Sequence, residues 1–497
     1  MSEIHASTTN SDDNGTSIHA PALPNDIIMQ DVNDQEDTKA LIQDDGSGEE
    51  ENEDEEDAVS VSTMIRNGGE PFETLRLKVA GLAAKVFHKK NSEVAIAQMK
   101  GGANNRVIGV TIIPKSKRFT LRWLKLFLQP HQRKSTTEPD SYVVRIPRTG
   151  VEGEDVVGAM GEDMKKEVAI LNTVKSRLAL PTPQVVHYDL TTDNIFERPY
   201  MIQKRLPGKN LQNQLWGELN TEQKKSVVKQ VANLPSIIAS VQGPAGDISV
   251  RNLYRPCDMP ILTDRFSTSA FYDQPASRQA SMCKPLDFLL ERINFWRAYQ
   301  TEHMGFCFED LWDSFEIISH SLDKYGLLKG PCVLVHGDLQ PYNLLAEIRS
   351  NNEVDITGVI DWDSAIIAPE FMAYIAPFWS WMPHEAASLT SAEEETFCLG
   401  VKPRTEAEKE IKQTFKDNAS DEYKKYAFSM EAVIARRMFY ILQNGIYGTW
   451  LMSEAQSLIV HYRELHPEDG IEFDDATEDE IEKARIAIAQ YKAGYKD

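Results

Sequence analysis

Two short apolar runs, each ending in a polar segment, constrain the fold of this chain more than any other feature. The first run, VLV, leads into His336-Gly337-Asp338, and the second run, ITGVI, leads into Asp361. Short apolar runs bounded by turn residues predict buried strands, so the polar residues fall on loops at the strand ends. The segment 331–365 therefore predicts a strand-rich core that brings acidic and amide side chains onto adjacent loops.

The polar groups on these loops match the needs of phosphoryl transfer. A carboxylate must accept the proton of the attacking hydroxyl, and an amide and a second carboxylate must hold Mg²⁺ against the anionic phosphates. On this interpretation Asp338 is the catalytic base or the group that orients the acceptor, and Asn343 and Asp361 bind the metal. His336 is either a catalytic residue or a structural histidine that braces the loop.

The chain resembles the aminoglycoside phosphotransferase family, which is related to choline kinases and to eukaryotic protein kinases. The strings H-G-D-x-x-x-x-N at 336–343 and I-D-W-D at 360–363 are similar to its catalytic and metal motifs. KGGANNRVIGV at 100–110 is similar to its nucleotide loop, and PYMIQKRLPG at 199–208 to its hinge. The likeness covers about residues 72–450 and is greatest to the fungal branch. It implies a bilobal protein-kinase-like α+β fold, with a small β-rich N-lobe and a larger, mainly helical C-lobe.

The resemblance also implies which residues bind the nucleotide, ATP or GTP. Gly101 and Gly102 would let backbone amides approach the phosphates. Arg145 would hold the α- and β-phosphates where protein kinases carry a lysine, since its planar fork can clamp a phosphate at two points. Glu167 on the next helix would pair with Arg145, and the alternative is an exposed helix position.

The hinge resemblance implies a place for adenine. Gln203, Lys204 and Arg205 would offer backbone groups to the base, so their side chains need not matter. The choice between ATP and GTP would depend on the geometry of this backbone.

Departures from the protein-kinase pattern favour a small-molecule acceptor. Gly337 replaces the arginine of the H-R-D loop, Gln340 stands at the position of a lysine, and Trp362-Asp363 replace Phe-Gly after the metal aspartate. Because no A-P-E signature follows, we expect transfer to a hydroxyl of a small molecule. A protein acceptor, a nucleotide-binding pseudoenzyme scaffold and non-phosphate chemistry at the same site are the alternatives.

Apolar periodicity and turn residues predict the remaining elements. Helices are predicted at 72–87, 163–178, 221–241, about 284–326, 421–445 and 478–493, the last after a capping box of Thr477 and Glu480. Strands are predicted around a turn within 100–113 and at 141–148, 181–189 and 198–208. The expected domains are an acidic arm at 1–62, an N-lobe at 63–207, a C-lobe at 208–464 and a C-terminal helix at 465–497.

The negative charge of the chain is concentrated at one end. Residues 1–60 hold 18 Asp and Glu residues against one Lys, a net charge of −17, whereas the whole chain carries −23. Such a segment cannot bury apolar area, which predicts a solvated disordered arm. A docking arm for a basic partner is the alternative. The acidic balance also argues against non-specific binding of nucleic acid.

Two further features concern the location of the protein. No stretch approaches 18 consecutive apolar residues, so no membrane span is expected. The basic apolar segment 118–134 is interpreted as packing on its own domain, with a membrane or partner surface as the alternative. The five cysteines form no C-x-x-C pair, which favours reduced thiols and a cytoplasmic protein.

Aromatic and acidic residues after the metal motif have two interpretations each. Phe378, Trp379 and Trp381 either pack against helices or line an apolar acceptor pocket. The run EEE at 393–395 lies either in a solvated loop or near a cationic acceptor.

Overall fold

The computed structural model describes most of the chain from residue 70 onward. The described residues are 70–99, 101, 105–113, 140–148, 156–256, 258–266, 279–382, 392–446, 448–473 and 476–494. The acidic arm at 1–62, the basic segment at 118–134 and Gly102 lie outside these ranges, so the expectations for them stay predictions. None of the helices in the described ranges has the length and apolar character needed to span a bilayer.

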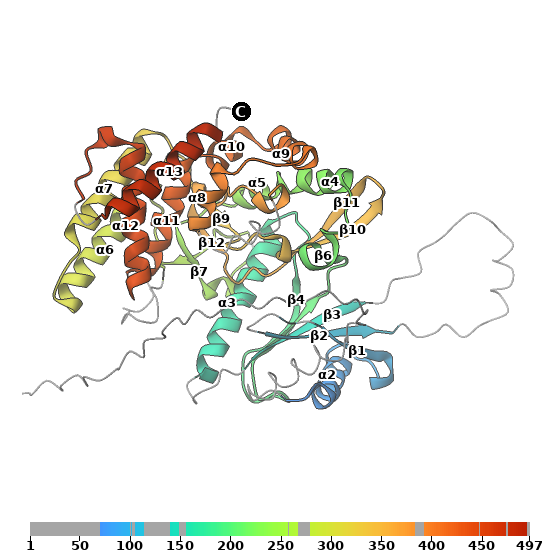
Figure 1. Ribbon diagram of the computed structural model, residues 1–497. Coiled ribbons are helices and arrows are strands. Elements are labelled where there is room, and N and C mark those ends of the chain that lie inside the picture. Colours follow the sequence, from blue (N-terminus) through green and yellow to red (C-terminus); the bar gives the residue numbers. More distant parts are fainter. Residues whose placement is uncertain are drawn as a thin grey trace, which may run out of the picture. The chain divides into compact units, whose positions relative to one another are not determined.

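The N-terminal part is a five-stranded antiparallel sheet with one helix packed against it (Figure 1). Its spatial order is β1 (Val94–Gln98), β2 (Asn105–Ile112), β3 (Ser141–Pro147), β5 (Tyr200–Lys204) and β4 (Gln184–Asp189). The helix α2 (Phe72–Val86) contributes buried side chains at helical spacing, among them Leu75, Val79 and Ala83, which pack with Val110 and Val144. The strand before the glycine turn ends at Gln98 and therefore lies just before the predicted 100–113 segment.

The helix α3 (Val156–Arg177) lies in sequence between β3 and β4 of this sheet but contributes its buried side chains to another core. Met164, Val168 and Leu171 recur at helical spacing and are buried in the large core that the C-terminal part of the chain also forms. The helix begins before the predicted start at 163. The apolar face of α3 thus packs against the C-terminal part of the chain, although the helix lies between strands of the N-terminal sheet in sequence.

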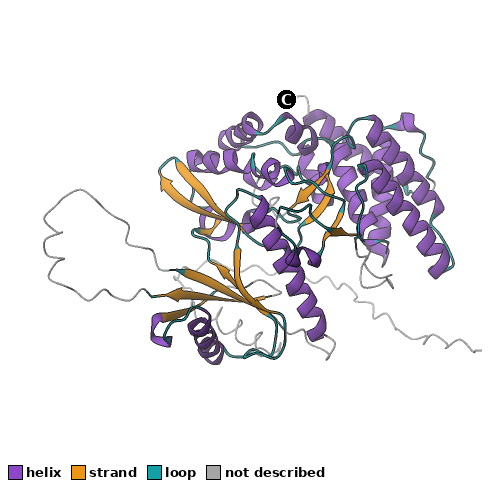
Figure 2. Cartoon of the chain, turned by 180° about the vertical axis from the view of Figure 1, so that it is seen from behind, coloured by secondary structure: helices purple, strands orange, loops and turns teal. Residues whose placement is uncertain are grey.

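The C-terminal part contains two small sheets, one among the helices and the other at its edge (Figure 2). One has the order β11 (Glu353–Val359), β10 (Leu344–Ser350) and β6 (Lys209–Asn210). The other has the order β8 (Thr263–Asp264), β7 (Gly246–Ile248), β12 (Ile366–Pro369) and β9 (Cys332–Val335). All four residues of β9 and of β12 are buried, which explains their uninterrupted apolar sequences.

Helices make up most of the C-terminal part. They are α4 (Thr221–Val231), α5 (Leu234–Ala239), α6 (Pro285–Tyr299), α7 (Glu309–Lys324), α8 (Ala392–Gly400), α9 (Glu406–Asn418), α10 (Asp421–Ala427), α11 (Met430–Asn444), α12 (Gly448–Leu465) and α13 (Glu478–Gly494). Three predicted helices are each divided in two, at 232–233, at 300–308 and at 428–429. The predicted capping box before α13 is confirmed, because Glu480 accepts from the Thr477 amide and Thr477 Oγ1 accepts from the Glu480 amide.

The buried apolar residues form two separate cores. The smaller core joins α2 to the five-stranded sheet, and the larger core joins α3, the two small sheets and the C-terminal helices. The prediction of an α+β fold with a small β-rich part and a larger helical part is confirmed.

Candidate active site

Antiparallel pairing brings the two polar loops together. In β9 and β12, Val335 pairs with Ile366, so the loop after β9 lies beside the loop before β12. In β10 and β11, Leu344 pairs with Val359, and the Ile360 amide donates to the Asn343 carbonyl at 2.9 Å. Residues 336–343 and 361–364 are therefore neighbours, although they are distant in sequence.

Gly337 is required by the close approach of these two loops. Its φ is +83°, and a Cβ there would lie 2.2 Å from the carbonyl oxygen of Ser364. An alanine could adopt this φ only with strain and could not avoid the backbone contact. The glycine that replaces the arginine of protein kinases is thus explained by packing of the loop.

Asp338 and Asn343 share a hydrogen-bond network. The Asn343 Nδ2 group donates to the Asp338 carbonyl at 2.9 Å and to Asp338 Oδ2 at 2.8 Å. The Tyr342 hydroxyl donates to Asp338 Oδ1 at 2.7 Å. Both carboxylate oxygens of Asp338 therefore accept a hydrogen bond. The Asn343 Nδ2 group donates to Asp338, so the Oδ1 atom of Asn343 remains available as a metal ligand.

His336 braces this loop. Its side chain is 2% exposed, its Nε2 lies 3.0 Å from the Ile360 carbonyl, and its Nδ1 lies 3.3 Å from the Asp338 amide nitrogen. Nε2 can only donate to a carbonyl and Nδ1 accepts from an amide, so these contacts suit the neutral ring. Burial lowers the pKa of His336 to about 4. These features favour the bracing role over direct catalysis.

Asp361 occupies a strained backbone position next to other acids. Its φ is +64°, which is uncommon for a residue other than glycine. Burial raises the pKa of this carboxyl, Asp363 raises it further, and Arg145 opposes both effects. Because a bound cation would relieve the repulsion between these carboxylates, the environment of Asp361 fits a metal ligand.

Arg145 links β3 to α3 and to the metal loop. Its guanidinium forms an ion pair with Glu167, and its Nη2 lies 3.4 Å from Asp361 Oδ1. Burial raises the pKa of Glu167 to about 7, against the influence of Arg145. Glu167 is buried, so the alternative of an exposed helix position is wrong. The Nε donor of Arg145 is buried without a partner among the described residues, which leaves it available to an anion.

The donor set fits magnesium better than a metal held by protein alone. In the described ranges no group of three or more His, Cys, Asp or Glu side chains is placed to hold an ion. Mg²⁺ is commonly bound through one or two carboxylates together with water and substrate phosphates. Asn343 and Asp361 provide that limited number of protein ligands.

The glycine loop is only partly described. Gly101 approaches the backbone so closely that a Cβ would lie 2.5 Å from the Asn105 carbonyl oxygen. Only glycine fits at this position. The close contact is with a residue four positions along the chain, so it explains the glycine without a ligand. Gly102 lies outside the described residues.

The hinge residues Gln203 and Arg205 already form contacts within the five-stranded sheet. Gln203 lies in the centre of the sheet, paired with Val143 on one side and Val185 on the other, and its buried Nε2 lies 2.9 Å from Met201 Sδ. The Arg205 amide donates to the Ser141 carbonyl at 2.9 Å. The Arg205 amide is thus used within the sheet, and the contact of backbone groups of Gln203, Lys204 and Arg205 with adenine stays a prediction.

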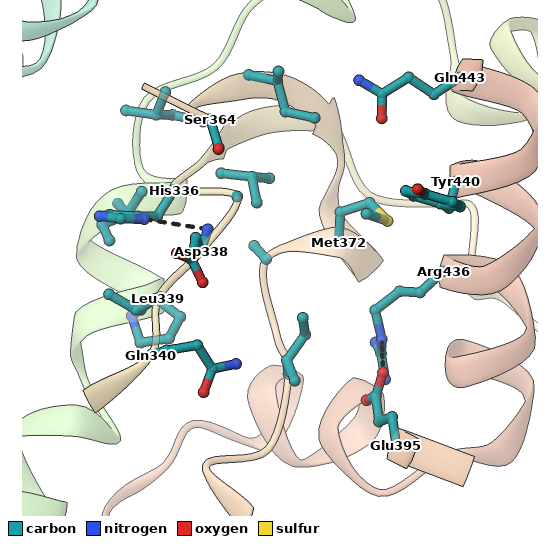
Figure 3. A pocket seen from close by; sticks show the side chains of 18 of the residues that line it. His336, Asp338, Leu339, Gln340, Ser364, Met372, Glu395, Arg436, Tyr440 and Gln443 are labelled. Carbon is teal, nitrogen blue, oxygen red and sulfur yellow. Dashed lines mark hydrogen bonds and ion pairs between the residues drawn. The ribbon is translucent and has the colours of Figure 1, made fainter. Parts of the chain in front are cut away.

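A cavity of about 750 Å³ adjoins Asp338. Figure 3 shows Arg436, Tyr440 and Gln443 projecting from one helix, α11, toward the loop that carries His336 and Asp338. Three ion pairs contribute to the cavity wall: Lys166 with Asp247 at 2.9 Å, Arg436 with Glu395, and Arg437 with Glu454 at 2.5 Å. The wall thus combines these three ion pairs with two further acids, Asp338 and Asp363, and with apolar and aromatic side chains.

The aromatic residues after the metal motif divide between the two interpretations. Phe378 and Trp381 are buried and contact each other, with ring centroids 5.9 Å apart. Trp379 lines the cavity and contacts Trp216, with ring centroids 4.9 Å apart. Glu395 belongs to α8 and forms a buried ion pair with Arg436, so neither interpretation of the EEE run describes it.

Sequence reasoning missed several residues of the site. Tyr342 lies within the catalytic string itself, one position before Asn343, but a tyrosine there gives no signal by its spacing. Lys166 is adjacent to Glu167 and resembles any exposed helix lysine in sequence. Arg436 and Arg437 lie far along the chain, and an arginine pair in a helix is ordinarily solvated. Only the folded chain shows that these residues line the cavity.

Comparisons with known proteins support the family resemblance. Residues 131–372 match the phosphotransferase enzyme family. A subtelomeric hrmA-associated cluster protein of Aspergillus fumigatus is 30% identical over 103 residues, which cover 21% of this chain and 19% of that protein. The alignment thus spans about a fifth of the relative's length.

Solved structures of phosphotransferases are also similar to this chain. The GDP complex of wild-type aminoglycoside 2′-phosphotransferase-IIIa matches 84% of this chain and 99% of that chain, with 13% identity and a TM-score of 0.36. The apoenzyme of a macrolide 2′-phosphotransferase from Brachybacterium faecium matches 77% and 97%, with 14% identity and a TM-score of 0.35. Because the identities and scores are this low, these structures support no conclusion about the substrate.

Proposed function

We propose, from the membership of residues 131–372 in the phosphotransferase enzyme family, that this chain transfers the γ-phosphoryl group of ATP or GTP to a hydroxyl of a small molecule. The observation that carries the proposal is the position of Asp338 and Asn343, joined by a hydrogen bond, on a loop that lies beside the loop of Asp361. These are the proton acceptor and the metal ligands that phosphoryl transfer requires.

Arg145 is proposed to bind the nucleotide phosphates. It is held from one side by Glu167, which leaves its buried Nε without a partner among the described residues. A guanidinium positioned in this way can donate two parallel hydrogen bonds to phosphate oxygens. The Arg205 amide already donates to the Ser141 carbonyl, whereas the Leu206 amide makes no backbone hydrogen bond within the described residues. We therefore propose that the Leu206 amide contacts adenine.

Asn343 and Asp361 are proposed to hold Mg²⁺. The ion would neutralise charge on the phosphates and orient them. Asn343 is suited because its Nδ2 group is fixed by Asp338, which directs Oδ1 away from that carboxylate. Asp361 is suited because its carboxyl lies beside both Arg145 and Asp363, where a divalent ion offsets the acidic charge.

Asp338 is proposed to accept the proton of the acceptor. The oxygen of the acceptor hydroxyl forms a bond to the γ-phosphorus while the bond from that phosphorus to the bridging oxygen of the nucleotide breaks. The hydroxyl proton passes to Asp338 Oδ1, and the nucleotide leaves as its diphosphate. Positioning of these groups supplies most of the catalysis in such reactions.

The cavity beside Asp338 is proposed to bind the acceptor. Its cations are already paired with acids of the same wall, and Trp379, Tyr440 and Met372 contribute apolar surface. A hydroxylated molecule with an apolar portion fits this lining. The reduced cysteines lead us to propose the cytoplasm as the place of reaction; the four that the structure describes are free thiols.

Nucleotide binding is the first test, measured as a thermal shift with ATP and with GTP, each with and without Mg²⁺. A ligand that binds only the folded state adds about 2.7 kcal/mol at 100 times its dissociation constant. We expect a magnesium-dependent shift in the wild type that Asp361→Ala removes and that EDTA reverses. The exposed loop variant Asp193→Ala is the matched control and should keep the full shift.

The absence of any shift in the folded wild type would contradict the proposal and favour a scaffold without nucleotide chemistry. Incorporation of phosphate into added protein, with no small-molecule product, would favour a protein kinase. A nucleotide shift that is independent of Mg²⁺ would contradict the assigned roles of Asn343 and Asp361.

A further inference from the structure

Both oxygens of the Asp338 carboxylate are occupied by groups of its own loop. Oδ2 accepts from Asn343 at 2.8 Å, and Oδ1 accepts from the Tyr342 hydroxyl at 2.7 Å. A general base must come within hydrogen-bond reach of the proton that it removes. A carboxylate oxygen can accept two hydrogen bonds, so an incoming hydroxyl either shares Oδ1 with the Tyr342 hydroxyl or displaces it, while Asn343 donates to the other oxygen.

The backbone of Tyr342 is fixed while its ring faces the cavity. Its carbonyl accepts from Asn210 Nδ2 at 2.6 Å, and the residue lies in the single turn Pro341–Asn343. The side chain lines the acceptor cavity and the residue is 38% exposed. The hydroxyl can consequently leave Asp338 by rotation of the side chain, without movement of the loop that carries Asp338 and Asn343.

We propose that Tyr342 is a specificity-determining residue, whose hydroxyl keeps water off Asp338 Oδ1 until an acceptor displaces it. The inference rests on the proposed phosphotransfer function. An acceptor gains contacts from the whole cavity wall and can replace one hydrogen bond, whereas a water molecule gains only that bond. The tyrosine therefore discriminates between an acceptor hydroxyl and water as the attacking group.

The reaction that Tyr342 suppresses is hydrolysis of the nucleotide. In it the water oxygen bonds to the γ-phosphorus, one water proton passes to Asp338 Oδ1, and the bond to the bridging oxygen of ADP breaks. The products are ADP and inorganic phosphate, and Asp338 then releases its proton to solvent. No other reactant is needed.

The test is release of inorganic phosphate from ATP and Mg²⁺ by the full chain, with no acceptor added. We expect Tyr342→Phe to hydrolyse ATP about tenfold faster than the wild type, as expected for the loss of one hydrogen bond to a charged group. Adding Asp338→Asn to Tyr342→Phe should abolish the increase, because water then has no base. Tyr254→Phe, at an exposed residue distant in sequence from the site, should hydrolyse ATP at the wild-type rate.

An unchanged or slower rate in Tyr342→Phe, with normal thermal unfolding and normal nucleotide binding, would overturn the inference. An increase that survives Asp338→Asn would also overturn it, since water would then be activated by another group. Failure of the wild type to bind nucleotide with Mg²⁺ would instead contradict the proposed function itself. The two failures are therefore distinguishable by the binding measurement.

Discussion

His336 illustrates how a single buried side chain supports the site. Its two ring nitrogens connect the Ile360 carbonyl to the Asp338 amide, and so join the loop of Asp361 to the loop of Asp338. Trp362 covers the ring, with centroids 4.4 Å apart. A protonated imidazolium would lose the acceptor at Nδ1 and would be buried as a charge, so the connection depends on the neutral form.

The stability of the protein should therefore depend on pH through His336. The pKa of His336 is about 4 in the folded chain, and its ordinary value of 6.5 applies to the unfolded chain. Between pH 4 and pH 6.5 the unfolded chain therefore binds more protons than the folded chain. The free energy of unfolding consequently falls as the pH is lowered from 6.5 to 4, by at most about 1.4 kcal/mol per pH unit from this residue. Above pH 6.5 the full contribution is present.

The measurement is denaturant unfolding of the wild type and of His336→Asn at several pH values in that window. We expect a shallower pH slope in His336→Asn. His320→Asn, at an exposed helix position, is the control and should retain the wild-type slope. Equal slopes for the wild type and His336→Asn would contradict the assignment of a buried neutral ring.

At the scale of elements, α11 connects three segments around the acceptor cavity. Arg436 on this helix pairs with Glu395 of α8, and its Nη1 donates to the Phe371 carbonyl at 2.8 Å. Arg437 pairs with Glu454 of α12. Both ion pairs are buried, so each charge depends on its partner more than a surface charge would.

Removal of one partner should thus be costly. We expect Glu395→Gln to lower the free energy of unfolding by about 3 to 5 kcal/mol, because Arg436 is left as a buried charge without its carboxylate. The matched control is Glu406→Gln, whose side chain is 84% exposed and pairs with Lys409 at 2.7 Å. That exposed pair should contribute less than about 1 kcal/mol.

Denaturant unfolding of the two variants distinguishes the buried pair from the exposed one. Similar small losses in both would show that solvent reaches Arg436 and that the pair does not hold α8 against α11. A large loss in Glu395→Gln alone would support the assigned role.

At the scale of the whole molecule, all described core residues and every described site residue lie in one compact unit within residues 57–497. Arg145 of the five-stranded sheet reaches Glu167 of α3 and Asp361 of the metal loop, so the candidate site depends on both apolar cores.

A chain beginning at residue 57 should therefore keep its thermal midpoint and its magnesium-dependent nucleotide shift. The physical reason is that the removed segment contributes charge and no described core residue. The measurement is thermal unfolding of the full and the shortened chain with and without ATP and Mg²⁺. A lower midpoint or a lost shift in the shortened chain would show that the acidic arm supports the folded unit. A basic partner for this arm stays a proposal.

Local sequence determined several of the elements and the two loops of the candidate site. Apolar spacing predicted α2, β3 and most of α3, and the strings around Asp338 and Asp361 identified the loops of the site, because periodicity and strand-end polarity are properties of neighbouring residues. The capping box of α13 was predicted for the same reason. The resemblance of these strings to a known family then predicted the pairing of Arg145 with Glu167.

Only the tertiary structure decided which distant side chains meet. The pairing of β9 with β12 brings Ser364 against Gly337, and the packing of α11 places Arg436 and Glu395 in the cavity wall. Such contacts depend on the packing of segments far apart in the chain, and this is why they have no signature in local sequence.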